Sequence, residues 1–469
     1  MDETMLSFMD ESELADALHA RVVHPLNRKF KTACTDSRKV TPDDLFVALS
    51  GERFDAHDFI PDVVKTGCHG AVVSRDLDVP EDFTLFVVED VLKSFGLLAK
   101  AILEKRRGLG NFTTYAVTGS NGKTTTKELL SLLLEAQGHC VLKTQGNFNN
   151  FVGLPMTVLN LTSQHDVAVL EMGANAPGEI AYLSGLGQPD IAIITCVGAA
   201  HLEGFGSLEG VAKAKGEMID APRLHKIVLP TETRRFYENR IPSGVEVVWV
   251  GNENSPEEIG IRNLTVHLDN IQFDYLDREK TVHLSLPLLG AHNAGNLARA
   301  IAALEGKTLT EAQLNEAIAK VHLPSGRMER WQSPEGTSFL HDAYNANPMS
   351  MAEAIKMMAK FKAPVCLVLG DMRELGPTSA DLHRELGKSA ARIHPVRILC
   401  VGEHAHDMKA GMLEEKYQES DAFCTSSENL ADGLVWLSGA LTPDTVCLIK
   451  GSRGVKLERV LEYFHASRK

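Results

Sequence analysis

The chain has 469 residues, 44% hydrophobic and 23% charged, with a formal net charge of −14. Length and composition predict a globular protein of roughly three domains of about 150 residues each, and the acidic charge argues against a nucleic-acid partner or an anionic membrane surface. The eight Cys are scattered with no Cys-x-x-Cys pair, and no apolar run approaches a membrane-spanning length, which predicts a cytoplasmic protein with reduced thiols and no membrane insertion.

Residues 1–108 are predicted to form a small α/β domain, because short apolar runs alternate with helical stretches. The expected strands are residues 30–35, 44–49, 69–74 and 83–88, and the expected helices are residues 60–66 and 92–104. Asp36, Ser37 and Arg38 follow the first strand, where they are able to grip a sugar or nucleotide diphosphate. Taken alone, this tripeptide is more typical of a capped turn. Residues 106–110 are predicted to be a linker.

The second unit, residues 109–322, opens with a glycine turn between an apolar run at residues 112–117 and a helix expected from Lys123 to about residue 136. Such a turn brings backbone N–H groups and a helix N-terminus to phosphate, while Lys123 supplies a full positive charge and the Thr124 hydroxyl is able to hold Mg²⁺. The glycine spacing is shorter than in the common Walker pattern, and the alternative is an ordinary glycine-rich turn. The candidate phosphate-binding residues are Gly119, Ser120, Asn121, Gly122, Lys123, Thr124 and Thr125.

Apolar runs at residues 166–170 and 190–197 predict buried parallel strands, and a further strand is expected around residues 140–143. Ligands of open α/β sheets lie at the carboxyl ends of such strands. Because Thr124, Glu171 and His201 all follow strand ends, we expect them to converge on an Mg²⁺ environment beside phosphate. Lys215 lies on a following helix, where the pattern alone predicts a solvated face.

The end of the second unit alternates polar and apolar residues at 264–268, 271–275 and 282–286. This pattern predicts a small antiparallel sheet appended to the main one. Asn293 and Asn296 then open an Ala-rich helix and share one of its faces. Two carboxamides there are able to read a purine edge, although simple capping of the helix is the alternative.

The third unit, residues 323–469, has expected strands at residues 337–340, 365–369, 397–401 and 445–449, separated by helical stretches. No G-x-G-x-x-G follows its first strand, so NAD binding is not inferred. The predicted fold is therefore α/β in three domains: a small N-terminal α/β domain, a central P-loop ATPase-like and mostly parallel sheet with the appended antiparallel sheet, and a C-terminal Rossmann-like doubly wound domain.

These motifs together resemble the Mur ligases of peptidoglycan synthesis, over essentially the whole chain. The phosphate loop TGSNGKTT at residues 118–125 has the short spacing of that family, and GAHNAGN at residues 290–296 resembles its Asn-x-x-Asn motif. Four stretches resemble the members that add D-alanyl-D-alanine: residues 44–58, 146–155, 342–348 and 369–376. The Asp-Asn-Pro-Arg motif of the members that add the third peptide residue is not in the sequence.

The resemblance implies an ATP-dependent ligase that joins D-alanyl-D-alanine to UDP-N-acetylmuramoyl-tripeptide through an acyl phosphate, with two Mg²⁺ ions. It places one ion on Thr124 and Glu171 and a second near His201. Lys215 falls where family members carry a lysine carbamylated by CO₂, which would also bind metal. The implied catalytic residues are Lys123, His201, Lys215, Arg327 and Asp342, with His201 and Asp342 as candidate bases for the incoming amine.

The resemblance also assigns binding roles outside the phosphate loop. The residues implied to contact the nucleotide are Asn293, Asn296, Arg327, Asp342 and Tyr344. Those implied to bind the other substrates are Asp36, Ser37 and Arg38 at the uridine diphosphate end, together with Asn149, Asn150, Asn345 and Asn347, the last two at the dipeptide.

Three alternatives stay open from sequence. A sister Mur ligase or a folylpolyglutamate synthetase-like ligase would use another amino acid. A P-loop kinase or NTPase would explain only the second unit. A nucleotide-sugar-binding or regulatory module that has lost catalysis is the third alternative, and the intact Lys123, Thr124, Glu171 and His201 speak against it. We expect a monomer whose domains close around the reaction, because an acyl phosphate must be kept from water.

Overall fold

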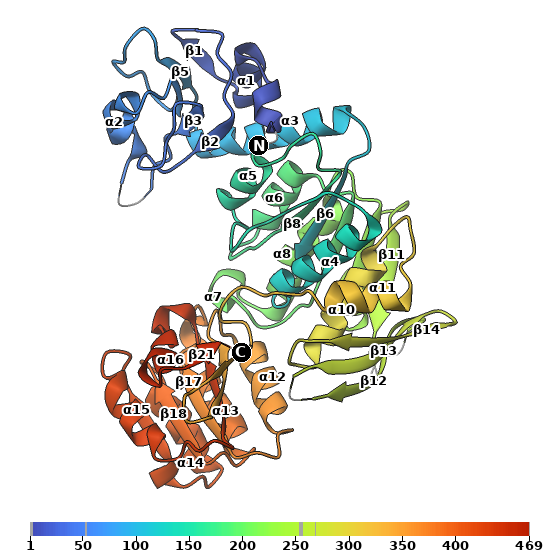
Figure 1. Ribbon diagram of the computed structural model, residues 1–469, viewed down its shortest axis with the longest axis vertical. Coiled ribbons are helices and arrows are strands. Elements are labelled where there is room, and N and C mark those ends of the chain that lie inside the picture. Colours follow the sequence, from blue (N-terminus) through green and yellow to red (C-terminus); the bar gives the residue numbers. More distant parts are fainter. Residues whose placement is uncertain (1–2, 52–53, 253–256, 268, 469) are drawn as a thin grey trace.

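The computed structural model of the chain describes residues 3–51, 54–252, 257–267 and 269–468. Among these residues the strands form three sheets, of five, nine and seven strands, which follow one another along the chain. The three sheets lie in series along the long axis of the molecule, with the N-terminal part at one end and the C-terminal part at the other (Figure 1). This arrangement confirms the predicted α/β class.

The N-terminal sheet has the order β1-β5-β4-β3-β2 and is parallel except for β1. Its strands and longer helices include the segments expected from sequence, with β1, α1 and the 3-10 turns η1 and η2 in addition. The elements are η1 (Met5–Phe8), α1 (Glu11–Leu18), β1 (Arg21–Val23), β2 (Thr32–Cys34), β3 (Asp44–Val47), η2 (Ala56–Phe59), α2 (Ile60–Lys65), β4 (Gly70–Val73), β5 (Thr84–Val87) and α3 (Val91–Gly108). Residues 52 and 53 of the motif at 44–58 lie outside the described residues.

The central sheet has the order β14-β13-β12-β11-β10-β9-β6-β8-β7. Its strands are β6 (Thr113–Thr118), β7 (Val141–Lys143), β8 (Val167–Glu171), β9 (Ile191–Ile194), β10 (Lys226–Pro230), β11 (Glu246–Gly251), β12 (Ile259–Val266), β13 (Ile271–Asp277) and β14 (Lys280–Leu286). Its helices are α4 (Lys123–Gln137), α5 (Gly153–Val158), α6 (Glu179–Gly187), α7 (Leu202–Phe205), α8 (Leu208–Lys215), α9 (Arg234–Tyr237), α10 (His292–Ala303) and α11 (Glu311–Ile318), with 3-10 turns η3 (Gly216–Asp220), η4 (Thr231–Thr233) and η5 (Glu238–Arg240).

The expected antiparallel ribbon, β12 to β14, continues the main sheet rather than forming a separate one. Strand β12 pairs in parallel with β11, and the ribbon then alternates in direction. Strands β10 and β11, which extend the parallel region from β9 to the ribbon, were not expected from sequence. Residue 268 of the expected ribbon lies outside the described residues.

Helix α3 joins the N-terminal and central parts into one hydrophobic core. Phe95 and Leu98 on α3 are fully buried in the same cluster as Leu154 of α5 and Leu183 of α6. The helices approach closely at Gly96, where a Cβ would lie 2.6 Å from the Tyr182 hydroxyl. The prediction of a linker at residues 106–110 is wrong for its first three residues, because they form the last turn of α3.

The C-terminal sheet has the order β19-β18-β17-β20-β16-β15-β21, parallel from β19 to β16 and antiparallel at β15 and β21. Its elements are β15 (Glu329–Gln332), β16 (Ser338–Asp342), α12 (Pro348–Met358), β17 (Val365–Gly370), η6 (Gly376–Thr378), α13 (Ser379–Ala391), β18 (Arg397–Val401), α14 (Ala405–Glu414), η7 (Glu419–Asp421), β19 (Ala422–Thr425), α15 (Leu430–Ser438), β20 (Val446–Lys450), η8 (Arg453–Val455), α16 (Glu458–Tyr463) and β21 (Ser467–Arg468).

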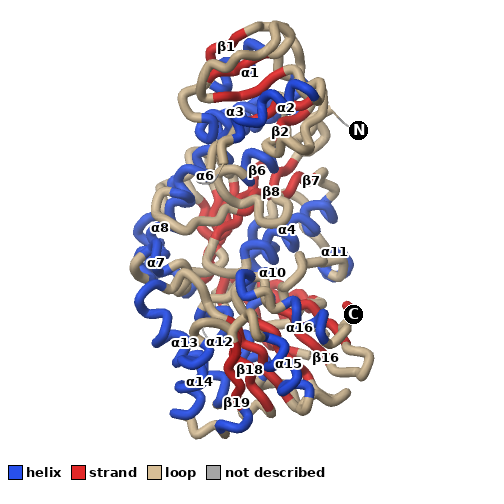
Figure 2. Tube along the Cα trace, turned by 90° about the vertical axis from the view of Figure 1, so that its left-hand side faces the viewer, coloured by secondary structure: helices blue, strands red, loops and turns tan. Residues whose placement is uncertain are grey.

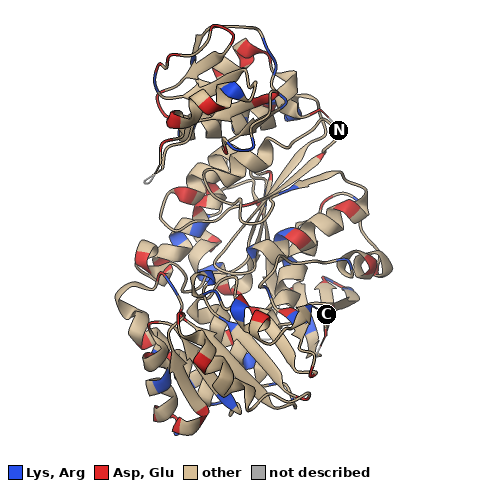
Figure 3. Ribbon diagram, turned by 60° about the vertical axis from the view of Figure 1, so that its left-hand side comes forward, with Lys and Arg blue, Asp and Glu red and all other residues tan. Residues whose placement is uncertain are grey.

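Charged residues of both signs are interspersed over all three parts in the view of Figure 3. Among the described residues, no helix combines the length and the apolar character needed to cross a membrane.

Candidate active site

A cavity of about 690 Å³ is lined by residues of both the central and the C-terminal part. Helix α10 lies at the boundary between these two parts (Figure 2). The predicted site residues that line the cavity are Ser120, Asn121, Gly122, Lys123, Thr124, Thr125, Asn149, Asn150, Glu171, His201, Asn293, Asn296, Arg327, Asp342, Tyr344 and Asn345. The predicted residues outside its lining are Asp36, Ser37, Arg38, Gly119, Lys215 and Asn347.

The phosphate loop connects β6 to α4 and is fixed by the end of β9. Gly119 has a φ of 139°, and a Cβ there would lie 2.1 Å from the Thr195 hydroxyl oxygen, so the close approach requires glycine. Thr195 donates a hydrogen bond to the Asn121 carbonyl. The Lys123 ammonium donates to the Gly119 carbonyl at 2.7 Å. Burial lowers the pKa of Lys123, and the nearby carboxylate of Glu171 opposes that shift.

Glu171 ends strand β8 beside this loop and is 2% exposed. One of its carboxylate oxygens accepts a hydrogen bond from the Asn149 amide at 2.8 Å. The other oxygen is buried and has no hydrogen-bond partner among the described residues. Thr124, in the first turn of α4, is buried as well and lines the same cavity. A buried carboxylate oxygen without a partner is costly unless a cation approaches it.

These donors fit Mg²⁺ bound together with phosphates. Such ions take one or two carboxylates from the protein and fill their remaining positions with phosphate oxygens and water. Glu171 offers the free carboxylate oxygen and Thr124 a hydroxyl. Within the described ranges, no three His, Cys, Asp or Glu side chains gather as a metal cluster.

Lys215 is buried. The prediction of a solvated face, made from the helical pattern alone, is therefore wrong. Its side chain lies at the end of α8, where its ammonium donates to the Ala174 carbonyl at 3.1 Å and lies 5.2 Å from the centre of the Phe205 ring. Burial, with a smaller contribution from the Lys123 charge, lowers the pKa of Lys215 to about 7. A large fraction of this amine is therefore neutral near neutral pH.

His201 follows β9 in the left-handed region, with a φ of 52°. Its Nδ1 pairs with the carboxylate of Glu374 from the C-terminal part. Burial lowers the pKa of His201, while the Glu374 charge opposes that shift. The imidazole is therefore held in one orientation across the boundary between the two parts.

A second polar contact across this boundary joins Asn121 of the phosphate loop to Asn347. The Asn347 amide donates to the Asn121 side-chain oxygen at 2.8 Å, and the Asn121 amide donates back at 3.2 Å. Asn347 also caps helix α12, because its side-chain oxygen accepts from the Ser350 backbone N–H at 2.9 Å. Its side chain thus ties the start of α12 directly to the phosphate loop.

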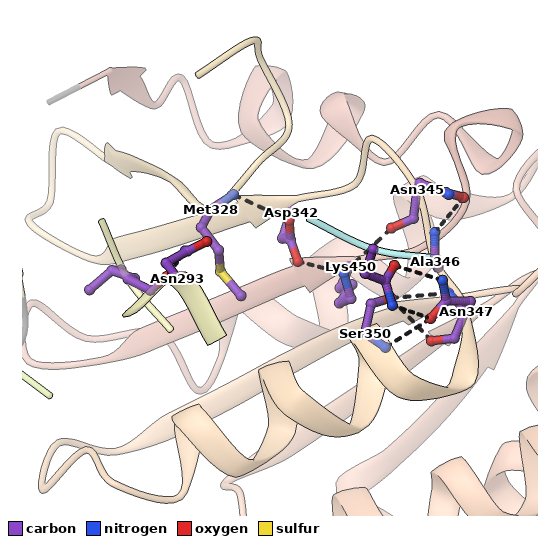
Figure 4. A network of polar contacts seen from close by, with 10 residues as sticks. Asn293, Met328, Asp342, Asn345, Ala346, Asn347, Ser350 and Lys450 are labelled. Carbon is purple, nitrogen blue, oxygen red and sulfur yellow. Dashed lines mark hydrogen bonds and ion pairs between the residues drawn. The ribbon is translucent and has the colours of Figure 1, made fainter. Parts of the chain in front are cut away.

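The C-terminal part brings four further predicted residues to the cavity: Arg327, Asp342, Tyr344 and Asn345. The Arg327 guanidinium lies 4.2 Å from the centre of the Tyr344 ring, which Arg453 also faces at 5.5 Å. Asp342 accepts a hydrogen bond from the Met328 backbone N–H at 3.2 Å and pairs with the ammonium of Lys450 (Figure 4). Lys450 donates also to the Asn345 carbonyl, at 3.4 Å.

Asn293 and Asn296 share a face of α10, as predicted, and both are buried. Asn293 donates to the Leu289 carbonyl at 2.7 Å and accepts from Asn296 at 2.9 Å. Asn296 lies against the phosphate loop, since a Cβ on Gly122 would be 2.5 Å from its side-chain oxygen. Arg299, one turn further, donates to that oxygen at 3.1 Å. The asparagines therefore brace the loop from α10.

The N-terminal candidates lie apart from this cavity. The guanidinium of Arg38 binds both carboxylate oxygens of Asp36, at 2.8 and 2.9 Å. These hydrogen bonds lower the pKa of Asp36 to about 2. Asn150 does line the cavity, from the loop before α5, and its side-chain oxygen accepts a hydrogen bond from the Gly153 backbone N–H at 2.9 Å.

Three residues of the cavity or its border had no assigned role from sequence: Lys450, Glu374 and Arg299. Lys450 directly follows a predicted strand, and Glu374 lies in the motif at residues 369–376. Both therefore occupy positions at which a site residue is expected. Their partners, Asp342 and His201, lie in other elements and are visible only in the folded chain. Arg299 sits within an Ala-rich helix that offers no such signal.

Two family models match the chain: the Mur ligase middle domain over residues 117–304 and the Mur ligase, glutamate ligase domain over residues 326–453. The UDP-N-acetylmuramoyl-tripeptide--D-alanyl-D-alanine ligase of Escherichia coli is 35% identical over 453 residues, which cover 96% of this chain and 97% of that relative. A crystal structure of MurF from Acinetobacter baumannii matches with a TM-score of 0.86 at 29% identity and 99% coverage of both chains. The MurF ligase of Thermotoga maritima in complex with ADP matches with a TM-score of 0.79 at 27% identity, with 96% of this chain and 98% of that chain covered.

Lys215→Met is expected to stabilise the fold, and to do so most strongly below about pH 7. The pKa of Lys215 is about 7 when folded and about 10.5 in its ordinary state, so the unfolded chain binds more protons between these values. Wild-type stability therefore gains with rising pH across that window, and the advantage of the variant shrinks. Urea unfolding in CO₂-free and metal-free buffer measures this.

The exposed neighbour Lys213 supplies the control, because Lys213→Met should change stability equally at both ends of the pH window. An advantage of Lys215→Met that stays constant with pH would contradict the assignment.

Proposed function

The chain belongs to the Mur ligase family, and we propose that it joins D-alanyl-D-alanine to UDP-N-acetylmuramoyl-tripeptide at the expense of ATP. The product is UDP-N-acetylmuramoyl-pentapeptide, with ADP and phosphate, and the reaction belongs to peptidoglycan synthesis. The observation that carries the proposal is the shared cavity. It places a phosphate loop and a buried acid of the central part opposite Arg327, Asp342 and Lys450.

The nucleotide is bound by the central part and covered by the C-terminal part. Lys123 and the loop amides hold its β- and γ-phosphates. Asn293 and Asn296 lie toward the adenine, and they also keep the loop rigid through the contact with Gly122. Arg327 and Tyr344, stacked on one another, approach the nucleotide from the opposite side together with Asp342.

Thr124 and Glu171 would hold Mg²⁺ beside the phosphates, and a second ion would lie near His201 and Lys215. When bound, these ions neutralise negative charge that develops on the transferred phosphoryl group. We propose that the neutral amine of Lys215 adds to CO₂, forming an N–C bond and releasing a proton. The resulting carbamate is an anion able to bind metal, whereas a free ammonium would repel it.

The remaining substrates reach the cavity from the two other parts. Asp36, Ser37 and Arg38 bind the uridine diphosphate end of the tripeptide substrate in the N-terminal part. Asn149 and Asn150 lie along its path at the mouth of the central part. Asn345 lies toward the dipeptide in the C-terminal part. The sequence also assigned Asn347 to the dipeptide, but its side chain is engaged with Asn121, so we propose that it supports the phosphate loop instead.

The reaction needs an activated carboxylate, because oxide is too poor a leaving group. The free carboxylate of the tripeptide attacks the γ-phosphate, and the acyl phosphate so formed is attacked by the amine of D-alanyl-D-alanine. Lys123 stabilises the charge of the phosphoryl transfer. Of the two candidate bases, Asp342 is engaged with Lys450. Mg²⁺ prefers oxygen ligands, so we propose His201 as a base rather than as a metal ligand. Burial lowers the pKa of His201, and its imidazole, oriented by Glu374, would accept the proton of the incoming amine.

The C-terminal part is proposed to close over the acyl phosphate. Among the described residues, the hydrophobic clusters of the C-terminal part contain only one buried residue from the central part, Leu289. Polar pairs such as His201–Glu374 and Asn121–Asn347 connect the two parts. Polar contacts exchange with water at little net cost, which suits a boundary that opens and closes. We further propose that the protein acts as a cytoplasmic monomer.

Phosphate release from ATP tests the function most simply. With Mg²⁺ and UDP-N-acetylmuramoyl-tripeptide, turnover is expected to require D-alanyl-D-alanine and to yield a product of pentapeptide mass. Removal of CO₂ is expected to slow the same assay, because Lys215 then stays an amine. Phosphate release that does not depend on the dipeptide would identify the protein as an NTPase. Phosphate release that requires another amino acid would identify it as a sister ligase.

The contact between Asn121 and Asn347 gives a second prediction. Asn347→Ser keeps a residue that caps helices well but removes the reach to the phosphate loop. Loss of these hydrogen bonds is expected to lower kcat about tenfold, while the urea midpoint and the KM for D-alanyl-D-alanine stay near the wild-type values. A selective rise in that KM would instead place Asn347 in contact with the dipeptide.

A further inference from the structure

Lys127 is a fully buried cation that the reaction described above does not use. It lies on α4 one turn after Thr124, and its side chain is 0% exposed. The ammonium donates to the Thr144 carbonyl at 2.6 Å and pairs with Glu128 at 2.7 Å. Burying an ammonium is costly even when it is paired, so a buried lysine in the phosphate-loop helix calls for a purpose beyond packing.

Thr144 connects Lys127 to Glu171, the buried carboxylate of the cavity. It follows β7 and is buried, and its backbone N–H donates to the Val169 carbonyl at 3.1 Å. Its hydroxyl accepts a hydrogen bond from the Glu171 backbone N–H at 3.0 Å. The carbonyl of Thr144 is thus held by α4, while its hydroxyl holds the residue whose carboxylate faces the cavity.

We propose that Lys127 and Thr144 are positioning residues that fix the separation of Thr124 and Glu171, the two side chains proposed to hold Mg²⁺. The inference rests on the proposed nucleotide site and adds to it a support that spans from α4 to the end of β8. Lys127 moves with Thr124 because both lie on adjacent turns of one helix. Thr144 moves with Glu171 because they share a hydrogen bond.

The chemistry of the ion explains why such a support matters. Mg²⁺ demands near-octahedral geometry with oxygen ligands at about 2.1 Å. Small displacements of either ligand therefore weaken its binding far more than they weaken the packing around it. Asn149 restrains the Glu171 carboxylate from the other side, at 2.8 Å, so a shift of the Glu171 backbone would tilt the carboxylate rather than carry it along.

The surroundings of Lys127 offer a matched control. Lys143 binds the other carboxylate oxygen of Glu128 at 2.7 Å and is 27% exposed. The Thr144 carbonyl accepts its hydrogen bond from Lys127. In Lys127→Met, Lys143 keeps Glu128 paired, so no buried carboxylate is left alone. In Lys143→Met, Lys127 keeps both of its contacts, and the support remains.

Binding of Mn²⁺ with ADP, followed by electron paramagnetic resonance of the free ion, tests the proposal without turnover. Thr144→Val keeps the shape and the carbonyl but removes the acceptor for the Glu171 N–H, and is expected to raise the Mn²⁺ concentration for half-saturation about tenfold. Thr144→Ser should restore it to within about twofold. Lys127→Met is expected to weaken binding at least as much as Thr144→Val, and Lys143→Met to leave it unchanged.

In the turnover assay, Thr144→Val and Lys127→Met should need a higher Mg²⁺ concentration for half-maximal rate, while their KM for D-alanyl-D-alanine stays constant. A general loss of stability would not change one of these quantities without the other. If Lys127→Met does not fold, the Thr144 pair decides the matter by itself. Unchanged Mn²⁺ binding in Thr144→Val would overturn this inference but not the proposed function. A loss of Mn²⁺ affinity in Lys143→Met as large as that in Lys127→Met would do the same. A wild-type protein that binds no ADP with metal would overturn the proposed function as well.

Discussion

The buried carboxylate of Glu171, facing a phosphate loop, is the constraint on which the rest of the structure depends. Two nucleotide phosphates and a substrate carboxylate would join it, so negative charge gathers at one point of a chain whose net charge is already −14. Positive charge has to be supplied locally and in a dry setting, where it acts strongly. Lys123 comes from the loop itself, and Arg327 and Lys450 come from the C-terminal part.

The origin of these cations explains the architecture. The N-terminal and central parts share one hydrophobic cluster through α3, which binds them as a single body. The C-terminal part meets that body through polar pairs beside the cavity. The closure proposed at this boundary would let the nucleotide enter first and would then bring the cations of the C-terminal part to it, so that the same movement would balance charge and exclude water.

Sequence predicted the strand ends well, because continuous apolar runs such as β8 and β9 are buried on both faces and leave little choice of structure. The strand ends in turn predict that Thr124, Glu171 and His201 converge at one edge of a sheet. Prediction from sequence failed where tertiary contacts decide. Lys215 was read as exposed from its helical pattern, yet Phe205 and the Ala174 carbonyl enclose it. The contacts of Asn347 with Asn121, of Asp342 with Lys450 and of Lys127 with Thr144 join different elements of the chain, and no local pattern predicts them.

The central claim is that this cavity activates a carboxylate by phosphorylation. The most direct test labels the free carboxylate of the tripeptide substrate with ¹⁸O and follows the label through one turnover with D-alanyl-D-alanine. Transfer through an acyl phosphate carries one labelled oxygen into inorganic phosphate. Phosphate that carries no label, because its new oxygen came from water, would contradict the account. Label found in AMP would contradict it as well.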